Sequence, residues 1–112
     1  MNFRKLDVYQ FALRLLPLAA AISDSLPPRC AALGDHFRRA SLSIALNIAE
    51  GSGKSTGPDQ RRFYAMARGS AMECAAILDA RRALALIEEA RAEQADQLLL
   101  STVRMLSKMC RL

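Results

Sequence analysis

The chain has 112 residues, of which 52% are hydrophobic and 24% are charged. This composition predicts one folded domain over residues 1–112 and excludes a disordered chain. Sixteen Lys and Arg residues against eleven Asp and Glu residues give a net charge of +5, which permits polyanion binding without establishing it.

The first predicted helix covers residues 6–25. Its apolar residues recur at intervals of three and four, as in an amphipathic helix: Val8, Phe11, Ala12, Leu15, Ala19 and Ile22. Pro17 should kink this helix, because proline removes one backbone hydrogen bond. The apolar stretch at 13–23 is too short for a membrane span and is interrupted by Arg14 and Pro17, so we expect a cytoplasmic protein with no membrane segment.

The second predicted helix covers residues 28–50 and starts near Pro28, since proline is tolerated in a first helical turn. Its expected core row is Leu33, Phe37, Ala40, Ile44 and Ile48, and Gly51 stands where a helix would end.

The segment AEGSGKST at 49–56 has the glycine, lysine and serine of a phosphate-binding loop. That loop requires a first glycine at position 48, where the chain has Ile48, and it requires a preceding strand. We therefore predict a corner between two helices.

The third predicted helix covers residues 58–85, after Thr56 or Gly57, with Pro58 in its first turn and Asp59 favouring its amino end. One apolar stripe follows: Phe63, Met66, Ala67, Ser70, Cys74, Ile77, Leu78 and Arg81. A break near 84–88 is required for a compact shape, although no glycine or proline marks it. The fourth helix covers residues 89–111, with Ala95, Leu98, Leu99, Thr102, Leu106 and Met109 inward. The fold class is therefore all-α, an antiparallel up-down four-helix bundle.

Candidates for catalysis and metal binding are few. The three cysteines are far apart and form no CxxC pair, which argues against a disulfide framework and a zinc site. His36 is the only histidine and lacks the Glu-x-x-His spacing of a di-iron bundle, so we read it as a surface or interface residue. We expect no enzyme, no metal and no cofactor.

Polar residues follow one edge of each central helix, beside the predicted core. Because an unpaired buried charge is costly, we expect a structural network at the loop end, with Arg39 or Arg68 opposite Glu50 or Glu73. The alternative is a shallow polar site. The candidate members are Arg39, Ser43, Asn47, Glu50, Arg68, Ser70 and Glu73.

The outer faces of the two central helices carry Leu42, Leu46 and Met72, where a solitary bundle would have polar residues. Apolar residues on more than one face predict burial in a homo-oligomer. The alternative is that these alanine-rich faces are tolerated in solvent.

Basic residues cluster in two places and are candidates for nucleic-acid contact. Arg104, Lys108 and Arg111 share the outer face of the fourth helix, and Arg38, Lys54, Arg61 and Arg62 are expected around the corner between helices two and three. A solvated basic face is the alternative.

Two long strings, LGDHFRRASLSIALNIAEGSGKS and RRFYAMARGSAMECAAILD, carry a resemblance that spans nearly the whole chain. The chain resembles the bacterial four-helix-bundle proteins of 23S rRNA intervening sequences, and also the accessory variability proteins of diversity-generating retroelements. The resemblance implies an up-down bundle that assembles into a ring, typically a pentamer. Its retroelement members are non-enzymatic partners of a reverse transcriptase and bind nucleic acid, so RNA, DNA or such an enzyme are the implied partners.

Two hypotheses follow for function. In the first, an oligomeric, non-catalytic bundle binds RNA, DNA or a nucleic-acid enzyme through its basic surface. In the second, the bundle is a protein–protein adaptor that uses its apolar outer faces and has no role with nucleic acid.

Overall fold

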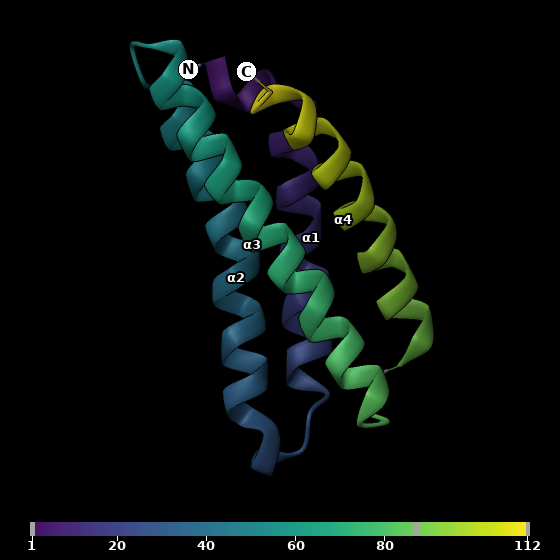
Figure 1. Ribbon diagram of the computed structural model, residues 1–112. Helices are drawn as coiled ribbons and strands as arrows, with labels where there is room; N and C mark the ends of the chain where they lie inside the picture. The colour runs from purple at the N-terminus through teal and green to yellow at the C-terminus, as the bar shows by residue number, and fades with distance from the viewer. Residues whose placement is uncertain (1, 87, 112) are drawn as a thin grey trace.

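Four long helices joined by short connections make up the part of the chain that the computed structural model describes, residues 2–86 and 88–111 (Figure 1). Consecutive helices run in opposite directions, and each helix packs against two neighbours in the cyclic order α1, α2, α3, α4. The all-α four-helix bundle is thereby confirmed. The helices are α1 (Asp7–Asp24), α2 (Ala31–Ser52), α3 (Gly57–Ala83) and α4 (Glu89–Met109), with short 3₁₀ helices η1 (Asn2–Lys5) and η2 (Pro28–Cys30) before α1 and α2.

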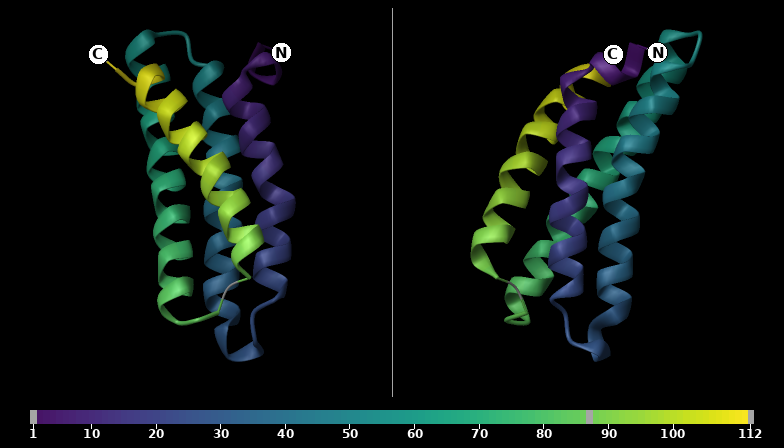
Figure 2. Two further views of the ribbon diagram at one scale, coloured as in Figure 1. Left: turned by 90° about the vertical axis from the view of Figure 1, so that its right-hand side faces the viewer. Right: turned by 180° about the vertical axis from the view of Figure 1, so that it is seen from behind.

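The bundle is elongated, with extents of 44 × 21 × 20 Å. The first and last helical residues and the α2–α3 connection lie at one end of it, which we name the termini end (Figures 1 and 2). The α1–α2 and α3–α4 connections lie at the opposite end, which we name the far end. These two ends prove to differ chemically.

The core forms along the inward stripe of each helix, as the spacing of apolar residues predicted. Val8, Leu15, Phe37, Ile44 and Leu106 are all buried. Phe11, Leu33, Leu98 and Met109, which were also predicted to be core residues, are only partly buried.

Met66 was predicted to face the core, but its side chain is 47% exposed. The inward side of α3 is centred on Ala67, Ala71 and Cys74, and Met66 lies about 100° from Ala67 around the helix axis. Tyr64 is buried on the other flank of the same side, and it was not in the predicted stripe.

Gly51 was expected to end the second helix, and this interpretation is wrong. α2 continues to Ser52, and Gly51 is a buried residue inside it. A Cβ atom at Gly51 would lie 2.9 Å from Cε1 of Tyr64 and 3.0 Å from Cβ of Phe63. The glycine therefore allows the last turn of α2 to approach the aromatic pair on α3 closely.

The other helix boundaries shift by a few residues. Pro28 begins the 3₁₀ helix η2, and α2 itself starts at Ala31. α3 begins at Gly57 with Thr56 as its N-cap, whose hydroxyl oxygen accepts a hydrogen bond from the Asp59 amide at 3.3 Å. The predicted corner within 49–56 is therefore present, and residues 53–56 form the connection itself.

The end of α3 uses an alanine where glycine is usual. Ala85 has a φ of 56°, in the left-handed region. The Leu86 amide donates to the Arg81 carbonyl at 2.9 Å and the Ala85 amide donates to the Arg82 carbonyl at 3.0 Å, which is the Schellman pattern. The break expected at 84–88 is therefore present over the residues described, but without the glycine that would have revealed it.

Candidate nucleic-acid interface

Charge is distributed unevenly along the bundle when it is divided at the middle of each helix. The termini half, residues 2–15, 42–69 and 100–111, holds ten of the sixteen basic residues and three of the eleven acidic ones. The far half holds six basic and eight acidic residues. The excess positive charge of the chain therefore lies entirely at the termini end.

Ion pairs reinforce this division. Of the eight found among the described residues, seven lie in the far half. Arg82 reaches three carboxylates, those of Asp79, Glu89 and Asp96. The termini half has a single pair, Arg62 with Asp59, at a long 3.8 Å. Most cations at the termini end are therefore not neutralised by a neighbouring carboxylate within the described part of the chain.

Aromatic residues gather in the same half as the cations. Phe3, Tyr9, Phe11, Phe63 and Tyr64 lie there, which leaves only Phe37 of the six aromatic residues in the far half. Lys54 Nζ lies 4.8 Å and the Arg62 guanidinium 4.6 Å from the centre of the Phe63 ring. Arg4 lies over Phe3 at 5.6 Å and Arg14 over Phe11 at 5.1 Å. Phe63 and Tyr64 are buried, so the rings at this surface are the partly buried Phe3, Tyr9 and Phe11. Cations interleaved with such rings are typical of surfaces that bind single-stranded nucleic acid.

Six of the seven predicted contact residues lie in the termini half. Lys54, Arg61 and Arg62 surround the α2–α3 corner, while Arg104 and Lys108 are exposed on α4 and Arg111 follows its end.

Arg38 was expected at the same corner, and this placement is wrong. It lies sixteen residues before Lys54 along α2, roughly 24 Å at the rise of a helix. There it pairs with Asp24 and Asp35 at the far end.

The predicted polar network exists in part, between α2 and α3. The hydroxyls of Ser43 and Ser70 are 3.0 Å apart, and the Asn47 side-chain amide donates to the Ser43 hydroxyl at 3.0 Å and to the Ser43 carbonyl at 2.9 Å. These bonds link the middle of the two helices, not the loop end.

The charged pairs expected in this network do not form among the described residues. Glu73 contacts His36 at 2.7 Å, and Arg68 donates to the Ser107 hydroxyl on α4 at 2.7 Å. Arg68 and Glu73 are five residues apart, so they point about 140° from each other around α3. Arg39 and Glu50 are exposed.

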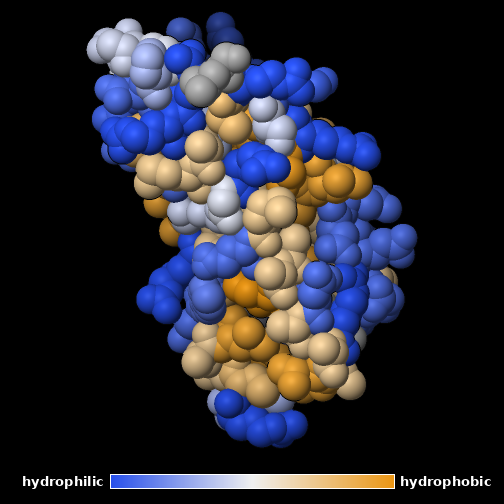
Figure 3. Space-filling model, in the orientation of Figure 1, coloured by the Kyte–Doolittle hydropathy of each residue, from blue (hydrophilic) through white to orange (hydrophobic). Residues whose placement is uncertain are grey.

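The outer apolar residues are exposed in the single chain, as predicted. The exposed fractions are 46% for Leu42, 58% for Leu46 and 50% for Met72. Figure 3 shows apolar residues from the middle of the face that it presents down toward the far end, while the termini end of this face is mostly hydrophilic. Gly69, in the middle of α3, has nothing within 4 Å of the position that a Cβ would take.

Arg81 is a charged core residue whose hydrogen-bond partners the sequence did not reveal. It lies in the predicted core stripe and is completely buried, with Nη2 donating to the Ile22 carbonyl at 2.7 Å and, more weakly, to the Leu86 carbonyl at 3.4 Å. Burial lowers the pKa of the Arg81 guanidinium. Its bonds join the end of α1 to the corner after α3, so the cation holds the far end together.

Further chemistry is limited in the described part of the chain. No group of three or more His, Cys, Asp or Glu side chains there could hold a metal ion. Cys74 is buried between the helices, and burial raises the pKa of its thiol to about 12, so it is unreactive at neutral pH. No helix within residues 2–86 and 88–111 is both long enough and apolar enough to span a membrane.

Comparison with known families finds a match over nearly the whole chain. The model of the family described as 23S rRNA-intervening sequence protein covers residues 4–108, which includes all four helices except the last residue of α4. A search of curated proteins returned no match.

Proposed function

Because the chain belongs to the 23S rRNA-intervening sequence protein family, we propose that it is a non-catalytic helical scaffold whose termini end binds the phosphates of nucleic acid, with RNA as the first candidate. The family name associates it with an RNA gene, and that association is the weaker support.

The observation that carries the proposal is the separation of charge. Ten basic residues share the termini half with three acidic ones, and seven of the eight ion pairs lie elsewhere. Cations that are left without carboxylates retain their full interaction with a polyanion, and the release of counterions on binding adds to the affinity.

Assembly into a ring, with a pentamer as the expected size, forms part of this proposal. It is supported by Leu42, Leu46 and Met72, and by Gly69, whose lack of a side chain serves no contact within the described chain. A glycine in the middle of a helix costs about 1 kcal/mol relative to alanine, so close approach by a second helix would give it a purpose. Copies around an axis would place several termini ends on one side and multiply their field.

The exposed apolar residues also favour a second candidate function. If the outer faces of α2 and α3 dock a different protein, the chain is an adaptor and its charge serves solubility. A partner enzyme that works on nucleic acid, such as a reverse transcriptase, would be compatible with both candidate functions, nucleic-acid binding and protein docking.

Two charge-matched double variants test the proposal. Arg104→Glu with Lys108→Glu changes the termini end, and Arg39→Glu with Arg91→Glu changes the far end by the same amount. Fluorescence anisotropy with a structured RNA should show a loss of affinity of at least tenfold for the first variant. The dependence of log Kd on log salt should also become less steep by about one for each phosphate contact removed.

The far-end variant should bind nearly as the parent protein does, apart from the general loss of positive charge. Equal losses in the two variants would mean that only net charge matters, and would contradict a localised surface. If the parent protein binds no RNA or DNA at low salt, while Leu42→Asp with Leu46→Asp abolishes capture of a protein partner, the adaptor function replaces the proposed one.

A further inference from the structure

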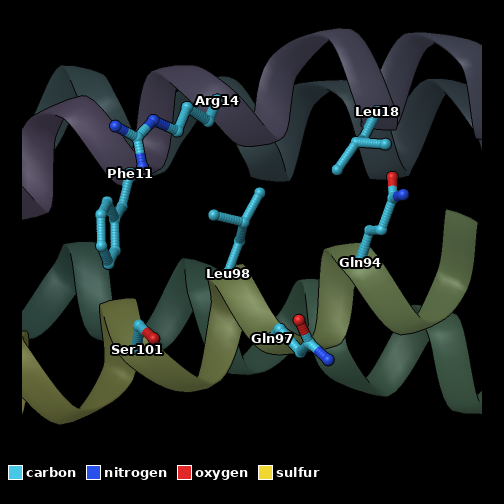
Figure 4. Close-up of a pocket in the computed structure, with 7 residues that line it drawn as sticks. All are labelled: Phe11, Arg14, Leu18, Gln94, Gln97, Leu98 and Ser101. Carbon is cyan, nitrogen blue, oxygen red and sulfur yellow. The ribbon is translucent and has the colours of Figure 1, made fainter.

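The seam between α1 and α4 contains two hollows on the side of the bundle that α2 and α3 leave uncovered. The larger one, about 460 Å³, is lined by Phe11, Arg14 and Leu18 from α1 and by Gln94, Gln97, Leu98 and Ser101 from α4. Figure 4 shows side chains from the two helices directed toward one another across it. The smaller hollow, about 220 Å³, lies further toward the termini end and includes Lys108.

The larger hollow combines an apolar floor with unused hydrogen-bonding groups. Leu18 and Leu98 are partly buried within it, and Phe11 stands at one edge. No hydrogen bond joins the side chains of Arg14, Gln94, Gln97 or Ser101 to another residue that the structure describes. None of the residues that line it carries a carboxylate.

This hollow is continuous with the basic surface. On α4, polar residues follow one another at intervals of three and four, which keeps them on one side of the helix: Gln94, Gln97, Ser101, Arg104 and Lys108. The row extends roughly 21 Å at 1.5 Å per residue. It begins with neutral amides beside the hollow and ends with cations at the termini end.

We propose that this seam takes an unpaired nucleobase from a single strand of RNA whose phosphates lie along Arg104 and Lys108. The proposal rests on the function proposed above and adds to it the form of nucleic acid that is bound. Carboxamides both donate and accept hydrogen bonds, as base edges do, and Arg makes paired hydrogen bonds to guanine.

A flat base also matches the apolar contacts. Phe11, with the Arg14 guanidinium 5.1 Å from its ring centre, offers a stacking surface of the kind that holds unpaired bases. A phosphate group suits the larger hollow less well, since Arg14 is the only cation among the residues that line it.

The test compares a ten-nucleotide single-stranded RNA, the same RNA with abasic sites at its central positions, and the corresponding duplex. Anisotropy titrations over a range of salt concentrations give an affinity and a salt dependence for each probe. We expect the complete single strand to bind about five- to a hundredfold more tightly than the abasic strand, the range typical of a base stacked on an aromatic side chain.

Two kinds of variant separate the base contact from the phosphate contact. Gln97→Ala, at an exposed helical position, and Phe11→Leu should reduce the preference for the complete strand while leaving the salt dependence unchanged. Lys108→Gln should make the salt dependence less steep while leaving the preference for the complete strand unchanged. Far-ultraviolet circular dichroism establishes that each variant is folded. If Phe11→Leu does not fold, Gln97→Ala alone still tests the base contact.

The outcomes distinguish the two proposals. Salt-dependent binding with equal affinity for complete and abasic strands would overturn the base site and leave the proposed function standing. Preferential binding of the duplex would likewise overturn the base site alone. Absence of binding to all three probes at low salt would remove both.

Discussion

The two ends of this bundle are built from the same four helices, yet electrostatics acts on them in opposite directions. At the far end, carboxylates pair with Arg38, Arg82 and Arg91, and Arg82 alone contacts Asp79, Glu89 and Asp96. The termini half holds ten basic residues and only three acidic ones. Its one ion pair among the described residues, Arg62 with Asp59, is long at 3.8 Å. Charge therefore favours folding at the far end and opposes it at the termini end.

This difference indicates where function should be sought. A surplus of like charge destabilises a folded chain slightly, whereas the same surplus strengthens binding to a polyanion. The far end shows how the chain neutralises arginines when only stability is involved. The termini end lacks that neutralisation, so substitutions at the two ends should affect stability and binding differently.

The largest expected effect is at Arg81, which joins the far end from within. Arg81→Ala should lower the free energy of unfolding by roughly 2–4 kcal/mol, because it leaves a cavity and removes the donor from the Ile22 and Leu86 carbonyls. Urea unfolding followed by circular dichroism measures this. Arg91→Ala, an exposed arginine at the same end, is the control and should change stability by well under half as much. Equal effects would show that the buried guanidinium has no special role.

A pair of glycines probes the packing of the termini end. Gly51→Ala should destabilise the chain by about 1–3 kcal/mol, because the new methyl group meets Tyr64 and Phe63. Gly69→Ala places the same methyl group in open space and should stabilise an isolated chain by up to about 1 kcal/mol.

Thermal unfolding of both variants measures the difference, and light scattering of Gly69→Ala adds information on assembly. A lower mass for this stabilised variant would support a close helix contact at Gly69. A stabilising effect of Gly51→Ala would contradict the packing described at the corner.

At the corner after α3, replacing an alanine by glycine is expected to stabilise the chain. Ala85 has a positive φ that costs a non-glycine residue about 1 kcal/mol, so Ala85→Gly should stabilise the far end by about that amount. Ala83→Gly, two residues earlier in the last turn of α3, should destabilise it by a similar or smaller amount. Chemical unfolding of the two variants tests the assignment, and a loss of stability in both would refute it.

The smallest expected changes in stability come from neutralising one arginine at each end of the bundle. Arg82→Gln removes a cation with three carboxylate neighbours and should lower stability by a few tenths to about 1 kcal/mol. Arg104→Gln relieves repulsion at the termini end and should raise stability slightly. Both differences should shrink in 1 M salt, where charges are screened over about 3 Å. If both variants change stability in the same direction at low salt, the electrostatic contrast between the ends is wrong.

The sequence predicted the fold well because helical spacing and helix position depend on local chemistry. The stripes from Val8 to Ile22 and from Phe37 to Ile48 follow directly from the period of the helix. The corner at 49–56 was recognised because Ile48 stands where a phosphate-binding loop needs glycine. The errors arose where one side chain decides between nearby alternatives, as with Gly51, which serves the packing of Tyr64 and does not end the helix.

The site was less predictable, because it depends on how separate helices are placed. Arg38 was grouped with Lys54 although a long helix separates them, a mistake that counting the helical rise would have prevented. Arg68 was expected opposite a carboxylate, but its direction on α3 leads to Ser107 of α4. The hollow beside Phe11 joins residues of α1 and α4 that are 76 to 90 positions apart, and no pattern in the sequence indicates it.

Alternating helix directions also determine the source of the protein's electric field. Each end of the bundle combines the amino ends of two helices with the carboxyl ends of the other two, so the helix dipoles largely cancel. The asymmetry therefore comes from side chains alone. A few exchanges between arginine and glutamate at exposed positions would strengthen, erase or reverse it without altering the backbone, so related bundles with this fold are free to differ widely in the ligands that they attract.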